Sequence, residues 1–204
     1  MNNRHKIKKN AYLEVINQWI EPNSHVVDLG CGQGILLESL IKTKRITGFG
    51  VDIQLEKITS CTQRGVPAYQ GDIGELLEKF PKNFFDWVIC SRTIQDIEEP
   101  SKVLSEALRV GKQVAVGFVN SAFWINRFHL LFRGQRVRNE VFSENWAQTR
   151  PSNPISVKEF EDFCSEQKIQ ILHRKFLKGD WIKTTSFLPN LTAGFALYHI
   201  SSKD

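Results

Sequence analysis

The spacing of apolar residues alternates along the chain between a helical period of three to four and short continuous runs. The first pattern predicts amphipathic helices, and β-branched runs bounded by turn residues predict strands. Helices are predicted at 12–20, 35–41, 55–64, 76–80, 101–108, 122–132 and 156–167. Strands are predicted at 25–29, 46–53, 66–70, 84–90, 112–118, 169–172 and 193–200. The strand–helix alternation as far as residue 118 predicts a parallel sheet with right-handed crossovers.

Several of these boundaries carry local signals of their own. Gly65 is expected to end a helix, because glycine takes the positive φ that closes one. Pro67 offers no N–H to a neighbouring strand and therefore indicates an edge strand. Ser101 and Ser156 are expected N-caps, and Glu159 completes a capping box with Ser156.

The pattern changes after residue 118. The region of about 121–155 begins with an aromatic helical segment and continues as a polar, irregular stretch. No internal repeat or linker divides the chain. We therefore expect a single domain over residues 1–204, with an insertion at about 121–155 that covers the site.

Composition narrows the class of protein. No run of about 18 apolar residues is present, so a membrane span is not expected. The basic N-terminus lacks the apolar stretch of a secretory signal, and the four cysteines form no CxxC pair. These features argue against a zinc site or a disulfide framework and favour a cytoplasmic protein.

The net charge of +5 raises the question of nucleic-acid binding. The excess lies mainly at the N-terminus and in Arg127, Arg133, Arg136 and Arg138, and it forms no long stripe. We therefore expect a solvated basic surface and no nucleic-acid partner.

A glycine-rich turn joins the first predicted strand to the helix after it. In Gly30-Cys31-Gly32-Gln33-Gly34, bare backbone N–H groups can face a ligand at a helix start. The third glycine of a dinucleotide-binding pattern would fall at position 35, which is Ile35, and no Walker lysine is present. Taken alone, the turn also allows a purely structural strand–helix connection.

Three carboxylates follow successive strand ends beside this turn. Asp28 precedes the first glycine, where it opposes a pyrophosphate but suits a ligand with an ammonium group. Asp52 lies 22 positions after Gly30, near the spacing of about 20 at which an acid reaches a ribose. Asp72 can accept a hydrogen bond from an adenine amino group, and Ile73 can lie beside the adenine ring. Taken singly, Asp28 and Asp72 also allow the alternative of a capping role.

Together these features point to S-adenosylmethionine or S-adenosylhomocysteine, because ligands of open α/β sheets bind at the carboxyl ends of the strands. The candidate cofactor-binding residues are Asp28, Gly30, Cys31, Gly32, Gly34, Asp52, Ile53, Asp72, Ile73 and Ser91. Cys31 is expected to pack, without a redox role. No metal site is expected.

Nearly the whole chain resembles the methionine-biosynthesis protein W (MetW) family of class I methyltransferase-like proteins. The resemblance rests on 19–20, 27–34, 48–53, 64–66, Asp72, 85–86, 93–95, 103–104, 108–111, 130–134, 188–191 and 196–198. The 27–34 block is shared by the whole superfamily, whereas 93–95 and 130–134 are much more specific.

The resemblance implies a doubly wound, Rossmann-like α/β fold whose seven-stranded sheet is mostly parallel with one antiparallel strand. It also implies a homoserine O-acyltransferase as a partner protein, whose acyl transfer the family supports. The alternative function is that of an active methyltransferase with a small-molecule acceptor. The chain departs from the family in 147–153, where Asn153 occupies the position of a family histidine, and at Gln33, where an aspartate is common.

No catalytic residue can be assigned from the sequence. A methyltransferase that acts on a weakly acidic group needs a general base, and Asp96, Glu98 and Glu99 follow the fourth strand. We favour the interpretation that these acids begin a helix and stabilise its dipole. His129 is expected to be a surface or core histidine.

Trp124, Phe128 and Phe132 are spaced four apart and form one stripe of the predicted aromatic helix. We expect this stripe to pack against the core. The alternative is an exposed aromatic face flanked by arginines, a composition typical of partner-binding surfaces.

Overall fold

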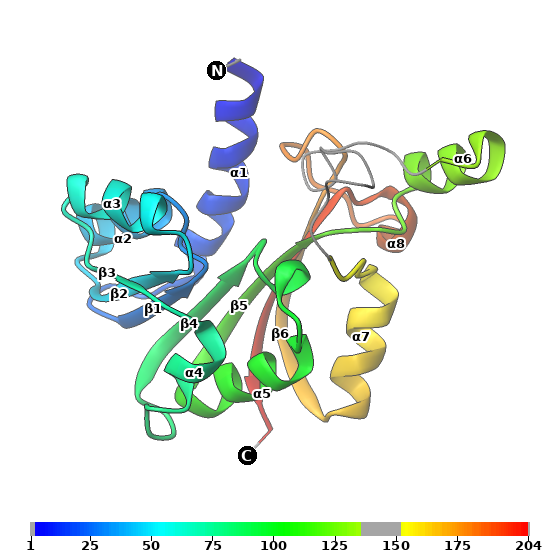
Figure 1. The fold of residues 1–204 in the computed structure, drawn as a ribbon. Helices are drawn as coiled ribbons and strands as arrows, with labels where there is room; N and C mark the ends of the chain where they lie inside the picture. The colour runs from blue at the N-terminus through cyan, green and yellow to red at the C-terminus, as the bar shows by residue number, and fades with distance from the viewer. Residues whose placement is uncertain (1–2, 136–151, 204) are drawn as a thin grey trace.

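A computed structural model describes residues 3–135 and 152–203. Their strands form a seven-stranded sheet in the order β3-β2-β1-β4-β5-β7-β6 (Figure 1). The strands are β1 (His25–Leu29), β2 (Thr47–Asp52), β3 (Ala68–Gln70), β4 (Phe85–Ser91), β5 (Gly111–Val119), β6 (Ile169–Leu177) and β7 (Phe195–Ser202). The helices are α1 (Asn3–Trp19), α2 (Ile35–Lys44), α3 (Leu55–Gln63), α4 (Ile73–Leu77), η1 (Ile94–Asp96), α5 (Pro100–Val110), α6 (Trp124–Arg133), α7 (Val157–Glu166) and α8 (Pro189–Thr192).

The predicted fold is confirmed. The first five strands run parallel to one another, and β7 is antiparallel to both β5 and β6. Parallel neighbours need a crossover connection, which the helices between the first five strands supply. Strand β7 instead lies directly beside β6 in the sheet and runs in the opposite direction. The predicted edge position of β3 is also confirmed, with Pro67 just before the strand.

Two apolar clusters fill the two faces of the sheet. Val26 belongs to a cluster that includes Ile16 of α1 and Leu40 of α2. Val27 belongs to the other cluster, which includes side chains of α4, α5 and α7. Both faces are covered, which explains the nearly continuous apolar runs of the central strands. Asp28 continues the alternation from Val26 and therefore lies on the face covered by α1.

Local signals predicted some boundaries and missed others. Gly65 has a φ of 73°, and the capping box of Ser156 and Glu159 is present. The expected cap at Ser101 is wrong. Helix α5 begins at Pro100 with Glu99 as N-cap, because the fixed φ of proline suits the first helical turn. Strand β6 is also longer than predicted.

Helix α6 lies outside the core. None of its residues is buried, and the side chains of Trp124, Phe128 and Phe132 are 50%, 49% and 68% exposed. The prediction that this stripe packs against the core is wrong, and the alternative of an exposed aromatic face describes it. Part of the predicted insertion, including Arg136 and Arg138, lies outside the described residues.

None of the described helices combines the length and the apolar character that crossing a membrane requires.

Candidate functional site

A cavity of about 1050 Å³ lies at the carboxyl ends of β1, β2, β3 and β4. The residues of this edge come from distant parts of the sequence, and the parallel strands bring them together. All predicted site residues except Gly34 line the cavity: Asp28, Gly30, Cys31, Gly32, Asp52, Ile53, Asp72, Ile73 and Ser91. Gly34 instead forms the N-cap of α2 with a φ of 73°.

The glycine turn is fixed to the neighbouring strand by its backbone. The N–H groups of Gly30 and Cys31 both donate to the carbonyl of Val51, at 2.7 and 3.0 Å. Gly30 has a φ of 74°, and a side chain there would collide with Thr93. The turn therefore requires glycine at position 30 both for its backbone conformation and for the close approach of Thr93.

Asp52 joins the turn to the loop after β2. Its Oδ2 accepts from the backbone N–H of Gly32 at 3.0 Å, and its Oδ1 accepts from that of Gln54 at 2.9 Å. A carboxylate has about four acceptor positions, so each oxygen can accept a further hydrogen bond from a ligand. The carboxylate is thus held in one orientation at the cavity wall.

Asp28 is buried at the end of β1, with 4% of its surface exposed. Burial and, to a smaller extent, the charge of Asp52 raise the pKa of Asp28 to about 7. Burial disfavours the charged form of a carboxyl group, and a nearby cation would restore it. The predicted capping role for Asp28 is not needed to explain its position.

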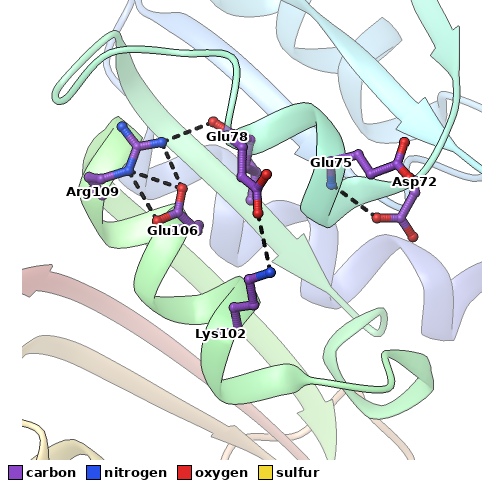
Figure 2. Close-up of polar contacts among 7 residues, drawn as sticks. Asp72, Glu75, Glu78, Lys102, Glu106 and Arg109 are labelled. Atoms are coloured by element: carbon purple, nitrogen blue, oxygen red, sulfur yellow. Dashed lines mark hydrogen bonds and ion pairs between the residues drawn. The ribbon is translucent and has the colours of Figure 1, made fainter.

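Asp72 has a structural role that the sequence already allowed. It is the N-cap of α4, and its Oδ1 accepts from the backbone N–H of Glu75 at 3.1 Å (Figure 2). On the same side of the cavity, Lys102 of α5 reaches Glu78 at 3.2 Å (Figure 2). Asp72 therefore caps a helix and lines the cavity at the same time.

Cys31 packs beneath the turn as expected. Its Sγ lies 3.8 Å from that of Cys61, and burial raises the pKa of both thiols. Gly50 leaves the space that the Cys31 sulfur occupies. The two thiols thus support the turn by packing beneath it, and the Cys61 thiol also donates to the carbonyl of Gly32 at 3.2 Å.

The far side of the cavity is formed by the segment after β4. Asp96, Glu98 and Glu99 line the cavity, and the same acids precede α5, as the helix-start interpretation requires. His129 lies on α6 and does not line it. These positions are compatible with both roles that the sequence allowed for the acids.

Two family-like residues of this segment have structural roles. Thr93 covers Gly30, and the buried side chain of Gln95 bonds both backbone groups of Val119, at 2.8 and 3.2 Å. Asn153, at the position of the family histidine, donates to the carbonyl of Ile97 at 2.6 Å. This asparagine attaches the end of the predicted insertion to the rim of the cavity.

Sequence reasoning missed two polar residues near this rim. Asn120 is fully buried and donates to the carbonyls of Asn190 and Ala193, while its Oδ1 accepts from Ala122 and Val157. Arg92 follows β4, lines the cavity and has a φ of 66°. A polar residue in an apolar context was the available signal for Asn120, and an arginine directly after a buried strand was the signal for Arg92.

The fold resembles solved structures at low sequence identity. A methyltransferase of Thermotoga maritima, described as S-adenosylmethionine-dependent and a possible histamine N-methyltransferase, matches with a TM-score of 0.72 and 18% identity, covering 98% of this chain and 92% of that one. The cyclase SpnF matches with a TM-score of 0.65 and 14% identity, covering 96% and 81%. These likenesses show a shared fold, and they include a protein named for a different reaction.

The sequence comparisons identify the family. The bifunctional methionine biosynthesis protein MetXA/MetW of Rhodopirellula baltica is 28% identical over 183 residues. The match covers 85% of this chain but only 29% of that protein, so the chain spans less than a third of its relative. The family model described as methionine biosynthesis protein MetW matches residues 10–200. With nearly its whole length matched, the chain belongs to the MetW family.

Proposed function

We propose that this chain binds S-adenosylmethionine or S-adenosylhomocysteine in the cavity and supports methionine biosynthesis together with a homoserine O-acyltransferase. The observation that carries the proposal is the placement of Asp28, Asp52 and Asp72 around one glycine turn in one cavity. The ligand presents an ammonium group, a ribose diol and an adenine amino group, which are donors suited to carboxylates. S-Adenosylmethionine supplies a methyl group on a positively charged sulfur when it is bound.

The charge of the cavity fits this ligand. Among the described residues, its lining includes eight acidic residues and three basic ones, Lys57, Arg92 and Lys102. Such a wall opposes phosphates and favours a ligand with a positive sulfonium and an ammonium group. Ser91 and Arg92 also line the cavity with buried polar atoms that have no hydrogen-bond partner among the described residues, as expected of a polar ligand site.

Support for the partner comes from the family. The resemblance implies a homoserine O-acyltransferase, and the bifunctional relative is named for MetXA and MetW in one chain. Two domains joined in one polypeptide meet each other at a high effective concentration. A separate chain of this family would reach its partner by docking.

Calorimetric titration of the purified chain with both nucleosides tests the ligand. We expect binding of S-adenosylmethionine and S-adenosylhomocysteine, with the methyl-bearing cation favoured by the acidic wall. Adenosine triphosphate is the matched control, because it carries the same nucleoside with phosphates that the wall opposes. Absence of binding at millimolar S-adenosylhomocysteine, or stronger binding of the triphosphate, would contradict the proposal.

Co-purification with the homoserine O-acyltransferase of the same source tests the partner. We expect a complex and a faster acyl transfer in the presence of this chain. The Asp52→Ala variant separates the two parts of the proposal, because it weakens the nucleoside site without changing the outer surface. An acyl-transfer rate that is the same with and without the chain would remove the accessory role.

A second candidate function is methyl transfer to a small molecule. The observation in its favour is that Asp96, Glu98 and Glu99 line the cavity, where an acceptor would lie. A positioned carboxylate there is able to accept a proton from the acceptor. Transfer of a labelled methyl group to a metabolite pool, without any acyltransferase, would favour this function over the accessory one.

A further inference from the structure

Buried polar atoms without partners gather at the end of β4. Among the described residues, Ser91 Oγ, Arg92 Nε and Ser152 Oγ are buried and have no hydrogen-bond partner, and all three residues line the cavity. A buried donor left unpaired is costly, and for a charged group the cost is larger. The Nε–H of Arg92 is therefore a buried, charged donor at the cavity that lacks an acceptor among the described residues.

The position of Arg92 is fixed from two sides. Its backbone N–H donates to the carbonyl of Gly117 at 2.7 Å, and its φ of 66° is uncommon for a residue with a side chain. The guanidinium carbon lies 5.4 Å from the ring centre of Trp181, a cation–π distance. Trp181 is itself buried and packs against Tyr12, which lines the cavity. The side chain is thus held beside the cavity before any ligand arrives.

No described carboxylate forms an ion pair with Arg92. Asp28 lies at the end of the adjacent strand β1 and lines the same cavity. A buried carboxylate and a guanidinium whose buried Nε has no partner among the described residues together complement an α-amino acid, which carries its ammonium and its carboxylate on the same carbon. Arginine suits the second of these groups, because its planar fork matches a carboxylate.

We propose that Arg92, held over Trp181, binds the α-carboxylate of the ligand's amino-acid tail while Asp28 binds the ammonium group. The inference rests on the proposed function, since it concerns the tail of the same nucleoside. It makes Arg92 a residue that selects the complete amino-acid nucleoside over a nucleoside without the tail.

Titration with two ligands tests the assignment. S-Adenosylhomocysteine carries the tail, and 5′-deoxy-5′-methylthioadenosine has the same nucleoside and thioether without it. We expect Arg92→Met to weaken S-adenosylhomocysteine binding by about 10- to 100-fold, because two charge-assisted hydrogen bonds are lost. Binding of methylthioadenosine should change by less than about twofold, which also shows that the variant folds.

Lys57→Met is the matched control, because it removes one positive charge from the same cavity without removing the fork over Trp181. Both ligands should retain their affinity for this variant within about threefold. Unchanged S-adenosylhomocysteine affinity in Arg92→Met, or an equal loss for both ligands, would overturn the assignment while leaving the proposed function intact. A wild-type chain that binds neither ligand would overturn the proposed function itself.

Discussion

The two sides of the cavity are built in different ways. On the side of the glycine turn, the backbone N–H of Gly30 donates to the carbonyl of Val51 in β2, and that of Gly32 donates to the Asp52 carboxylate. On the side of residues 92–99, the cavity is lined by Arg92, whose backbone has a positive φ, and by acids that precede a helix. A binding site held rigidly loses little entropy when its ligand arrives. The difference indicates that the side proposed to hold the nucleoside is more rigid than the side where an acceptor would lie.

The largest expected effect comes from breaking the rigid side at Gly30. Gly30→Ala places a Cβ against Thr93 at a φ of 74°, so backbone strain and overpacking add. We expect the free energy of unfolding to fall by about 2–4 kcal/mol. Urea unfolding measures this loss, and calorimetry should show that S-adenosylhomocysteine binding falls with it.

Gly32→Ala is the control within the same turn. Gly32 has a φ of 54°, but nothing lies within 4 Å of an added Cβ. Only the backbone strain remains, so we expect a loss of about 1 kcal/mol. Equal destabilisation by the two variants would contradict the close contact between Gly30 and Thr93.

The second effect concerns Asp52, which links the turn to the loop after β2 and lines the cavity proposed for the nucleoside. Asp52→Ala should weaken nucleoside binding by about 1–3 kcal/mol, through loss of hydrogen bonds to a charged acceptor. Asp52→Asn keeps one oxygen and should lose less. Calorimetric titration compares the two variants, and an unchanged affinity in Asp52→Ala would place the ribose elsewhere.

The rigid side was also the more predictable one. The spacing of Gly30, Asp28 and Asp52 could be read from the sequence because consecutive strand ends of a parallel sheet meet at one edge. The alternation of strands and helices predicted the parallel part of the sheet, and the resemblance to the MetW family implied the one antiparallel strand. Boundaries such as Pro100 were missed, because serine and proline signals competed over two adjacent positions.

The other side depends on contacts between residues far apart in the chain. Arg92 becomes recognisable only when Trp181 lies beneath it, 89 positions later. The exposed stripe of α6 has the same periodicity as a buried one, so spacing alone could not distinguish them. Tertiary packing, which no local pattern encodes, decided both features.

A third effect is the pH dependence of binding, which distinguishes the contribution of the ligand's charged tail from that of its nucleoside. The pKa of Asp28 is raised to about 7 in the free protein, mainly by burial. A bound ammonium favours the ionised form, so S-adenosylhomocysteine affinity should fall as pH drops below 7, by up to about tenfold per unit. Methylthioadenosine has no ammonium group and should show a flat profile in the same calorimetric series.

The stability of the free protein should move in the opposite direction. The folded-state pKa of Asp28 lies above its ordinary value of 3.8, so its contribution is present at acidic pH and is lost as pH rises through about 7. Asp28→Asn should remove both pH dependences. If Asp28→Asn kept the pH dependence of S-adenosylhomocysteine binding, another group would have to hold the ammonium.

The smallest expected effect lies on the acidic side, in the pair Glu98 and Glu99. Both residues precede α5, where a negative charge interacts favourably with the helix dipole. Replacing both by glutamine should lower the free energy of unfolding by about 0.3–1 kcal/mol per charge and leave S-adenosylhomocysteine affinity within about twofold. Urea unfolding and calorimetry measure the two quantities, with Lys57→Met as a control for charge change at the cavity. Because these acids lie apart from the tied turn, a large loss of nucleoside affinity would show that the two sides act as one site. A loss of methyl transfer alone would instead give the acids a place in acceptor chemistry.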